Sequence, residues 1–387
     1  MTELRIAIFT GNYNHIKDGV SLTLNRLVRF LESKGVPVLV IAPTKNNPAI
    51  DHEGTMVPVP SIPAPGRPEY RISLTFSEVA RQEVDAFRPT LIHVATPDLL
   101  GLKALYYARE KGVPLVSSYH THFASYLQYY NLEILDSLLW KYMFWFYGNC
   151  RKVFVPSPSM LKWLNKKGFT DNFTIWARGV NVDLFDPAKR DMKLRKKLGV
   201  KDDEKILLFV SRLVWEKDIR TVLDTAKILL KKNPKLKLVI AGDGPIKEEM
   251  EREIPEAIFT GFVFGEELAK VYASSDVYLF PSDTESFGNV TLEAMASGLP
   301  AVVANAVGSS SLVENKVNGY LTRPKDVEAF AENVQKILDD DELRKTMSEN
   351  SRAKALNYKW DDIMTGLLND YREVVESYYG RSPVAKR

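Results

Sequence analysis

The chain of 387 residues is 45% hydrophobic and 26% charged, which is ordinary for a soluble globular protein, and its length favours two domains over one. No stretch reaches about 18 apolar residues, so a transmembrane helix is not expected. The single cysteine, Cys150, excludes an intrachain disulfide and fits a reducing compartment.

Positive charge is concentrated in the first part of the chain. The formal net charge is +3, and residues 1–180 hold 20 Lys and Arg against 14 Asp and Glu. This balance suits an anionic partner such as a membrane surface, but ordinary scatter of surface charge explains it equally well. The start, MTELRIAIFTGNY, favours a first strand over a signal peptide. We therefore expect a cytoplasmic protein, with peripheral contact at the inner face of the membrane as a finer expectation.

Short apolar runs alternate with amphipathic stretches along the whole chain. In the first half, LRIAIF, VPVLVIA, LIHV, PLVSS and KVFVP read as buried strands, with helical patterns such as LTLNRLVRFLESKG between them. The second half restarts the alternation with KILLFV, LKLVIAG, AIFTG, DVYLFPS and PAVVA. Such alternation predicts an α/β fold of two Rossmann-like, doubly wound parallel-sheet domains.

The domain boundary is expected in the stretch 178–200, which is polar and charged and contains a proline. We place the first domain at 1–180, the second at 181–356, and a C-terminal helix at 357–387 that returns to the first domain. Ligands of open parallel sheets bind outside the carboxyl ends of the strands, so the expected site is a cleft between the two domains.

Two stretches of the first half follow predicted strands and carry polar or glycine residues. TGNYNHIKDGVSLTLNRL contains Gly11 and Gly19, and a helix beginning near Val20 would point N–H groups at an anion. A plain strand-to-helix turn explains this stretch as well. VSSYHTHF places His120 and His122 on one side of an extended segment, but no further ligands at suitable spacing support a metal site. A histidine here suits hydrogen bonding to a substrate, or simply a solvated loop.

Two stretches of the second half carry complementary charges. In FVSRLVWEKDIR, Arg212 and Lys217 follow a strand and suit a diphosphate, although pairing with neighbouring acids is the alternative. In ESFGNVTLE, Glu285 lies in a loop and Glu293 about one turn into a helix. Both carboxylates are able to accept hydrogen bonds from hydroxyls, while the Phe287, Gly288 and Asn289 backbone presents N–H groups. Acids beside cations suggest a sugar nucleotide; helix capping and a surface acid are the alternatives. The glycines of AGDGP, 241–245, fit either a ligand or a turn.

The sequence resembles the retaining GT-B glycosyltransferases of glycosyltransferase family 4 over nearly its whole length. The motifs that carry the resemblance occur in the family's order: RIAIFT…DGVSLTLNRL, SSYHTHF, VPSPSM, ARGVNVDLF, SRLVWEKD, AGDGP and ESFGNVTLEAMASGLPAVV. It is most similar to the subgroup that glycosylates membrane lipids, which includes GDP-mannose-dependent mannosyltransferases and sulfoquinovosyl-lipid synthases.

The resemblance implies a role for each candidate residue. Gly19 would lend its backbone N–H to the donor phosphates, and His120 would contact the donor sugar. Arg212 and Lys217 would stabilise the leaving diphosphate. Glu285 and the backbone of Phe287, Gly288 and Asn289 would hold the sugar hydroxyls, and Glu293 the ribose. The donor would be a GDP- or UDP-linked hexose of mannose or glucose type, transferred to a lipid or glycan acceptor without an obligatory metal or other cofactor. Nucleic acid is not an expected partner.

One departure from the family pattern lies after PAVVA. The family commonly shows a glycine pair followed by an acid, whereas this chain has Gly308 followed by three serines. If Ser311 takes the place of the acid, one contact to sugar or phosphate is changed, which leaves the identity of the donor sugar open.

The stretch 123–152 is rich in aromatic residues bordered by Lys141, Arg151 and Lys152. An interfacial membrane helix has this pattern, and so does a helix packed beside an acceptor cleft. For the activity itself, two alternatives to a transferase stay open: a nucleotide-sugar epimerase or hydrolase on the same scaffold, and a non-enzymatic sugar-nucleotide binder. SRLVWEK combined with the two glutamates argues against the first, and the intact set of candidate residues argues against the second.

Overall fold

The computed structural model describes residues 3–65, 67–119, 136–169 and 172–380. The chain divides into two units. Unit 1 consists of Met1–Pro156, Leu164–Trp176 and Asp361–Arg387, and unit 2 of Ser157–Trp163 and Ala177–Trp360. Residues 361–380 therefore fold with the N-terminal part of the chain, whereas the short segment 157–163, at the start of α6 (Pro158–Lys166), folds with unit 2.

The described part of unit 1 is built on a parallel sheet of seven strands in the order β3-β2-β1-β6-β7-β8-β9, with a separate antiparallel pair β4-β5. Most of its strands are apolar along their length because a parallel sheet is covered on both faces. The strands are β1 (Ile6–Phe9), β2 (Val38–Pro43), β3 (Thr55–Val59), β4 (Ser61–Ala64), β5 (Arg67–Ser73), β6 (Leu91–Val94), β7 (Leu115–Ser118), β8 (Lys152–Val155) and β9 (Phe173–Ile175).

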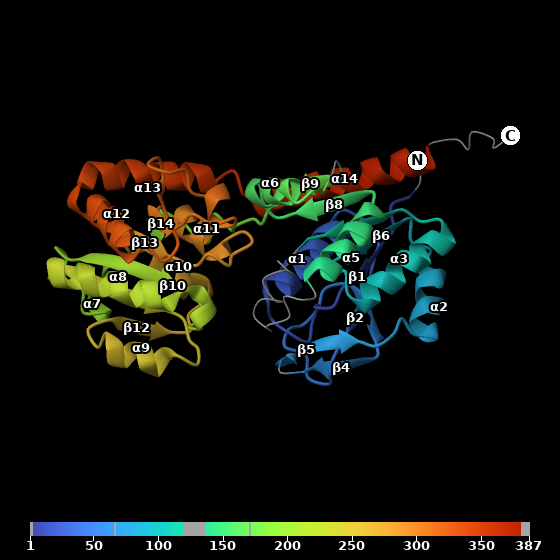
Figure 1. The fold of residues 1–387 in the computed structure, drawn as a ribbon, viewed down its shortest axis with the longest axis horizontal. Helices are drawn as coiled ribbons and strands as arrows, with labels where there is room; N and C mark the ends of the chain where they lie inside the picture. The colour runs from blue at the N-terminus through green and yellow to red at the C-terminus, as the bar shows by residue number, and fades with distance from the viewer. Residues whose placement is uncertain (1–2, 66, 120–135, 170–171, 381–387) are drawn as a thin grey trace. The chain divides into compact units, whose positions relative to one another are not determined.

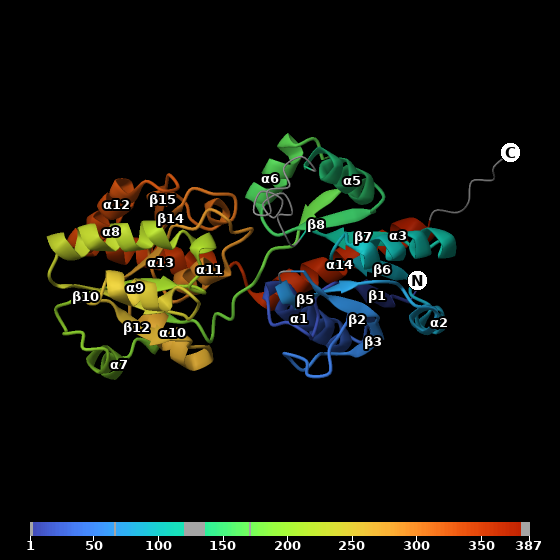
Figure 2. The same cartoon turned by 60° about the horizontal axis from the view of Figure 1, so that its bottom comes forward.

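Helices flank this sheet, as Figures 1 and 2 show. α1 packs against β2, α2 against β2 and β3, and α3 against β1 and β6. The first helix begins at Gly19, where Asp18 accepts a hydrogen bond from the Ser21 N–H at 2.8 Å and so caps the N-terminus. The helices are α1 (Gly19–Ser33), α2 (Glu78–Phe87), α3 (Leu99–Lys111), α5 (Asp136–Gly148) and α14 (Trp360–Tyr379).

The C-terminal helix α14 is joined to the unit 1 sheet by a buried polar chain. The His93 side chain on β6 is fully buried; its Nδ1 lies 2.7 Å from the Tyr371 hydroxyl and its Nε2 lies 2.6 Å from Ser118 Oγ. Burial lowers the pKa of His93 to about 3, so the ring stays neutral. Lys152 adds ion pairs to Asp370 at 2.7 Å and Glu373 at 2.6 Å. These contacts explain why the last helix belongs to unit 1.

Unit 2 contains, in the part of the chain described, a parallel sheet of six strands in the order β12-β11-β10-β13-β14-β15. Counted from β10, this is the doubly wound order 3-2-1-4-5-6. The strands are β10 (Lys205–Val210), β11 (Leu236–Ala241), β12 (Ile258–Gly261), β13 (Val277–Phe280), β14 (Ala301–Ala304) and β15 (Gly319–Thr322).

Two helical layers cover this sheet. α8 packs against α12 and β11, whereas α11 packs against α10, α13, β13 and β14. The helices are α7 (Met192–Lys197), α8 (Ile219–Lys232), α9 (Lys247–Glu253), α10 (Gly265–Ala273), α11 (Asn289–Ala296), α12 (Val327–Asp339) and α13 (Asp341–Ala355), with short 3₁₀ turns η2 (Pro187–Lys189), η3 (Trp215–Lys217) and η4 (Ser309–Ser311).

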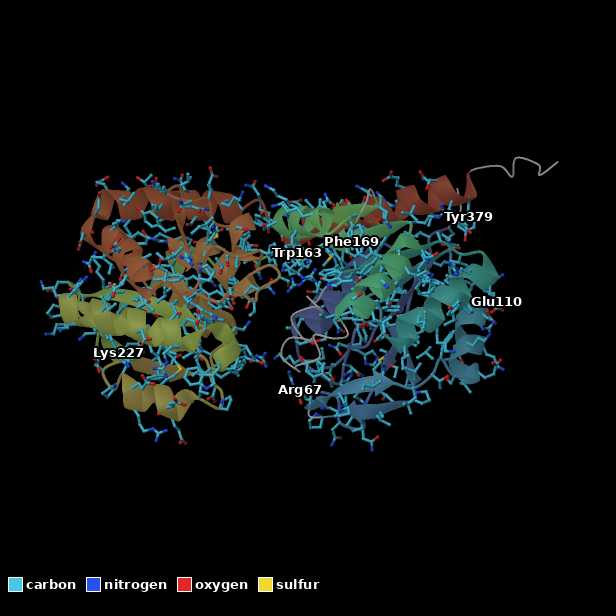
Figure 3. All side chains as sticks on the ribbon, in the orientation of Figure 1. Arg67, Glu110, Trp163, Phe169, Lys227 and Tyr379 are labelled. Carbon is cyan, nitrogen blue, oxygen red and sulfur yellow. The ribbon has the colours of Figure 1, made fainter. Side chains whose placement is uncertain are left out.

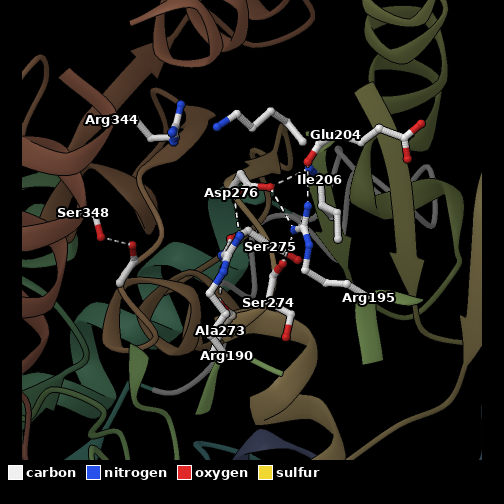
Figure 4. A network of polar contacts seen from close by, with 12 residues as sticks. Arg190, Arg195, Glu204, Ile206, Ala273, Ser274, Ser275, Asp276, Arg344 and Ser348 are labelled. Carbon is white, nitrogen blue, oxygen red and sulfur yellow. Dashed lines mark hydrogen bonds and ion pairs between the residues drawn. The ribbon is translucent and has the colours of Figure 1, made fainter. Parts of the chain in front are cut away.

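The polar stretch 178–200, in which we expected the boundary, is anchored to unit 2 by a network of charges (Figure 4). Arg195, 1% exposed, donates to the Ser274 carbonyl at 2.7 Å and the Glu204 carbonyl at 2.6 Å and lies 3.2 Å from Asp276 Oδ2. Arg190 lies 3.1 Å from Asp276 Oδ1. The charges of this stretch therefore bind the amino ends of β10 and β13 rather than forming a solvated linker.

Candidate functional site

The carboxyl ends of β10 and β13 define the expected ligand edge of unit 2. These two strands are neighbours in the sheet, and the strand order reverses between them, which makes this the topological switch point. β10 runs into Ser211 and Arg212, and β13 runs into the loop 281–288 that contains Glu285. Sheet topology thus brings together two motifs that lie far apart in the sequence.

Lys217 and Glu285 form an ion pair between Nζ and Oε1 across this edge. Each side chain is 20% exposed, so the pair is largely withdrawn from water. The Thr284 hydroxyl also donates to the Glu216 carbonyl at 3.1 Å and ties the two loops together. Lys217, the cation predicted to bind a diphosphate, therefore contacts Glu285, the carboxylate predicted to bind sugar hydroxyls.

Arg212 is exposed directly after β10 and forms no ion pair with any other described residue. Its loop is held by the neighbouring AGDGP turn, where the Leu213 N–H donates to the Asp243 carbonyl at 2.9 Å. A Cβ on Gly242 would lie 1.8 Å from the Ser211 carbonyl oxygen, and one on Gly244 2.3 Å from that of Leu213. Both glycines therefore allow the two strand-exit loops to pack backbone to backbone, and this packing positions Arg212.

The Phe287, Gly288 and Asn289 segment forms the start of α11. The Phe287 ring is 3% exposed and packs edge-on against Tyr358, with ring centroids 5.9 Å apart. Gly288 has φ +95°, a left-handed conformation that favours glycine, and Asn289 is the exposed first residue of the helix. Because the aromatic side chain is buried, this segment can offer a ligand mainly its backbone N–H groups.

Glu293 lies one turn into α11, and its Oε2 accepts a hydrogen bond from the Tyr272 hydroxyl at 3.2 Å. Burial raises the pKa of Glu293 to about 7, and the hydrogen bond from Tyr272 opposes the rise. Tyr272, at 0% exposure, is a residue that the sequence analysis did not single out. The sequence around Tyr272 contains no pattern that would indicate its hydrogen bond to Glu293.

Gly308 is a second residue that was not assigned a role. A Cβ at this position would lie 2.4 Å from the Glu285 carbonyl oxygen and 2.8 Å from its carbonyl carbon. The loop after β14 therefore rests on the backbone of Glu285, and only glycine leaves room for this approach. In the sequence, Gly308 stands out only as the glycine before the serine run. Its contact with Glu285 is known only from the structure.

Replacing Gly308 with alanine is expected to displace Glu285 and to lower kcat/KM of glycosyl transfer by about 10²-fold, the scale of an ångström-sized misplacement. The added methyl meets backbone atoms, which cannot rotate away as a flexible side chain would. Steady-state kinetics of the variant provide the measurement.

Gly366→Ala is the matched control for this change, because a Cβ at Gly366 meets nothing within 4 Å and alanine suits the middle of α14. Equal rates for the Gly308 variant and the wild type would show that the contact does not position Glu285.

Ser311, the last residue of the serine run after Gly308, contacts Ser159. The Ser159 N–H donates to Ser311 Oγ at 3.1 Å, and the two hydroxyls are hydrogen-bonded to each other. The Ser159 hydroxyl is also paired with the Val307 carbonyl. The serine run thus helps to dock the segment 157–163 on unit 2, a role that the sequence did not reveal.

Two predicted site residues belong to the N-terminal part of the chain. Gly19 is the exposed first residue of α1, beside the Asp18 cap, which also accepts a hydrogen bond from Asn12 Nδ2 at 2.8 Å. His120 lies outside the described residues, so its contact with a donor sugar stays a prediction. Arg212, Lys217, Glu285, Phe287, Gly288, Asn289 and Glu293 all belong to unit 2.

Across the described ranges, no group of three or more His, Cys, Asp or Glu side chains is arranged to hold a metal ion. None of the helices described combines the length and apolarity needed to cross a bilayer.

α5 exposes part of the aromatic stretch. Leu138 is 65% exposed and Trp145 39%, whereas Phe146 is fully buried. Phe144 stacks on Phe169, labelled in Figure 3, with ring centroids 4.1 Å apart. Two cations lie over tryptophan rings of α5: Lys167 over Trp140 and Arg109 over Trp145. We call the exposed residues Leu138, Phe144 and Trp145 of α5, together with the exposed Tyr106 of α3, whose ring lies beside Trp145, the α5 surface.

The comparisons with known proteins cover nearly the whole chain. Residues 17–184 match the family described as Glycosyltransferase Family 4, and residues 191–354 match Glycosyl transferases group 1. Sulfoquinovosyl transferase SQD2 of Arabidopsis thaliana is 31% identical over 376 residues, 95% of this chain and 73% of that protein. A GDP-mannose-dependent alpha-mannosyltransferase of Corynebacterium glutamicum is 31% identical over 376 residues, 96% and 89% of the two chains. Alpha-monoglucosyldiacylglycerol synthase of Streptococcus pneumoniae is 29% identical over 330 residues, 82% and 75% of the two chains.

A solved structure shows the same fold. Sucrose-phosphate synthase from Thermosynechococcus elongatus matches with a TM-score of 0.80 at 22% identity, over 97% of this chain and 100% of that chain. The predicted pair of Rossmann-like, parallel-sheet domains is therefore confirmed, as is the resemblance to the GT-B glycosyltransferases of family 4. The chain belongs to the GT-B glycosyltransferases of group 1 and family 4.

Proposed function

We propose that the protein transfers a hexose of mannose or glucose type from a GDP- or UDP-linked donor to a lipid or glycan acceptor, with retention of configuration and without an obligatory metal. The observation that carries the proposal is the Lys217–Glu285 pair at the switch point of unit 2, with Arg212 exposed in the same β10–α8 connection as Lys217. The names of two relatives, a GDP-mannose-dependent mannosyltransferase and a glucosyldiacylglycerol synthase, support the donor and acceptor classes.

Donor binding exchanges the partner of Lys217 in this scheme. Its ammonium leaves the Glu285 carboxylate for the oxygens of the diphosphate, where Arg212 supplies a second cation. Glu285 is then free to accept hydrogen bonds from the sugar hydroxyls. When the glycosidic bond breaks, negative charge builds up on the diphosphate, and the two cations stabilise it in the transition state.

The remaining roles complete the site. The backbone N–H of Gly19 would contact the donor phosphates, His120 would contact the sugar, and the Phe287, Gly288 and Asn289 backbone would hold the sugar hydroxyls. The acceptor attacks on the face that the diphosphate leaves, and the leaving phosphate takes the acceptor proton, so configuration is retained. Two protein cations meet the charge of the diphosphate, which is why no metal is required.

Glu293 is assigned to the ribose hydroxyls, which predicts a pH dependence. The ionised carboxylate is the better acceptor, and the pKa of Glu293 is about 7, so nucleoside diphosphate binding should tighten as pH rises through 7. Between pH 6 and pH 8 the dissociation constant should fall by about tenfold. Calorimetry with GDP and UDP measures this change, and Glu293→Gln, which cannot ionise, supplies the control for titration of the nucleotide itself. An equal pH dependence in both proteins contradicts the assignment.

The α5 surface is proposed to contact an anionic membrane. Its exposed aromatic and aliphatic side chains lie beside Arg109 and Lys167, a combination that suits the boundary of acyl chains and headgroups. We expect the wild type to sediment with vesicles of phosphatidylcholine and phosphatidylglycerol. A double variant, Leu138→Gln with Trp145→Gln, should sediment with these vesicles to a smaller extent. Val79→Gln, which alters an exposed residue of α2, is the control. A wild type that ignores such vesicles refutes the contact.

Product analysis tests the activity. The protein is incubated with GDP- and UDP-linked mannose and glucose, together with diacylglycerol and soluble glycan acceptors. A new glycoside with the donor's anomeric configuration is the expected product. An epimerised or hydrolysed sugar would favour an epimerase or hydrolase, and nucleotide binding without turnover would favour a sugar-nucleotide binder. A thermal-shift panel of UDP, GDP and ADP identifies the nucleotide, because a ligand of the folded state raises its apparent stability.

A further inference from the structure

A cavity lies in unit 2 at the amino end of β13, the strand that leads to Glu285. Its volume is about 230 Å³. Asp276, in its wall, immediately precedes β13, whereas Glu285 follows that strand. The carboxyl end of α11 and the first turns of α13 complete the wall. The lining residues that bear on its chemistry are Arg190, Asp276, Ser297, Asp341, Arg344 and Lys345.

On one side of the cavity, Arg190 in the lining shares the Asp276 carboxylate with Arg195, which is 1% exposed and is not part of the lining. Arg190 Nη2 lies 3.1 Å from Asp276 Oδ1, and Arg195 Nη1 lies 3.2 Å from Oδ2 (Figure 4). Oδ2 accepts a further hydrogen bond from the Ile206 N–H at 2.7 Å. The carboxylate is therefore fully used, and this cluster keeps one uncompensated positive charge.

On the α13 side of the cavity, cations again outnumber carboxylates. Asp341 is shared by Arg344 at 2.5 Å and Lys205 at 3.4 Å. Lys345, in the next position of the helix, forms no ion pair with any other described residue. Arg344 is only 17% exposed, so its charge is held beside the cavity rather than extended into water. Positive charge thus exceeds negative charge on two sides of the same space.

A buried hydroxyl adds a hydrogen-bonding group. Ser297 is 3% exposed, lines the cavity, and its Oγ has no hydrogen-bond partner among the residues that the structure describes. By contrast, Ser348 Oγ already donates to the Gly298 carbonyl. Buried hydroxyls are normally paired, so an unpaired one in the wall of the cavity is an observation that a bound oxygen-rich ligand would explain.

We infer that this cavity binds the phosphate group of a small phosphate monoester, a site separate from the donor diphosphate. Arginine and lysine recognise phosphate oxygens by charge and by directed N–H groups. At about 30 Å³ per water, the space holds roughly eight waters, which suits a phosphate on a three-carbon alcohol. Pockets for larger ligands occupy about 300–1,000 Å³. The same chemistry occurs in soluble glycerol phosphate and in the headgroup of phosphatidic acid.

Calorimetry with sn-glycerol 3-phosphate tests the site, using the Lys217→Ala variant as background so that the donor site does not take up phosphate. Binding is expected in this background and is expected to weaken by about tenfold or more when Arg344→Gln and Lys345→Gln are added. Sedimentation with phosphatidylcholine vesicles, with and without phosphatidic acid, distinguishes a lipid headgroup from a free ester.

The control carries Lys231→Gln and Lys232→Gln instead, which removes the same charge from the last turn of α8, outside the cavity lining. It should bind glycerol phosphate as the background does. Ser297→Ala, which leaves every charge in place, should weaken binding by a smaller factor. If the double variant binds both glycerol phosphate and phosphatidic acid vesicles as the background does, or if neither binds at all, the inference is wrong.

Discussion

Replacing Lys217 with alanine is expected to lower the turnover number by about 10²-fold or more, because it removes a cation that stabilises charge on the leaving diphosphate. The change also leaves the Glu285 carboxylate without its counter-charge in the free protein. Arg212→Ala is expected to have a similar effect through the second cation. Single-turnover kinetics with the donor found by product analysis measure the chemical step apart from product release.

Two comparisons make this expectation specific. Lys217→Arg keeps the charge and should retain more activity than the alanine variant. Lys231→Ala removes an exposed lysine from the end of α8 and should leave the rate unchanged. Near-normal turnover in both Lys217→Ala and Arg212→Ala would mean that these residues do not bind the diphosphate.

The largest effect on stability is expected at Asp276. Asp276→Ala leaves Arg195, 1% exposed, without its ion-pair partner, and it removes the acceptor of the Ile206 N–H. Breaking a buried pair by removing one partner costs about 3–5 kcal/mol in the free energy of unfolding. This is a large share of the roughly 5–15 kcal/mol by which proteins are stable. Denaturant unfolding followed by circular dichroism measures the loss.

Asp341→Ala is the matched control, because Asp341 is also shared by two cations but is 74% exposed. Exposed ion pairs contribute little to stability, so its unfolding midpoint should stay close to that of the wild type. Equal midpoints for the Asp276 and Asp341 variants would contradict the argument that burial makes the difference.

Much of the fold follows from local patterns. Runs such as KILLFV and LKLVIAG are apolar at every position but one, which indicates strands buried on both faces, and they became β10 and β11. The stretch 178–200 was less informative. Its charges look like those of a linker, but Arg190 and Arg195 bind Asp276, which lies in another part of the sequence. Charge alone does not distinguish a solvated segment from one anchored by ion pairs.

The individual members of the site were predicted from their places after strands. Arg212 follows β10, Glu285 lies in the loop after β13, and Glu293 lies in the helix that this loop enters. Gly308 and Tyr272 were missed, since one acts by leaving room for a distant carbonyl and the other by a single hydrogen bond from a different helix.

The sequence by itself determined the two-domain α/β fold, because strand and helix periodicity is local, and it indicated the family through its motifs and their order. It also suggested the chemical types of the candidate site residues from their places after strands. Only the tertiary structure decided which residues meet. Lys217 and Glu285 are separated by 68 positions, and they pair because β10 lies beside β13 in the sheet. Gly308 reaches Glu285 through the loop after β14, the next strand in that order. Strand order is set by the packing of the whole sheet, and no local pattern contains it.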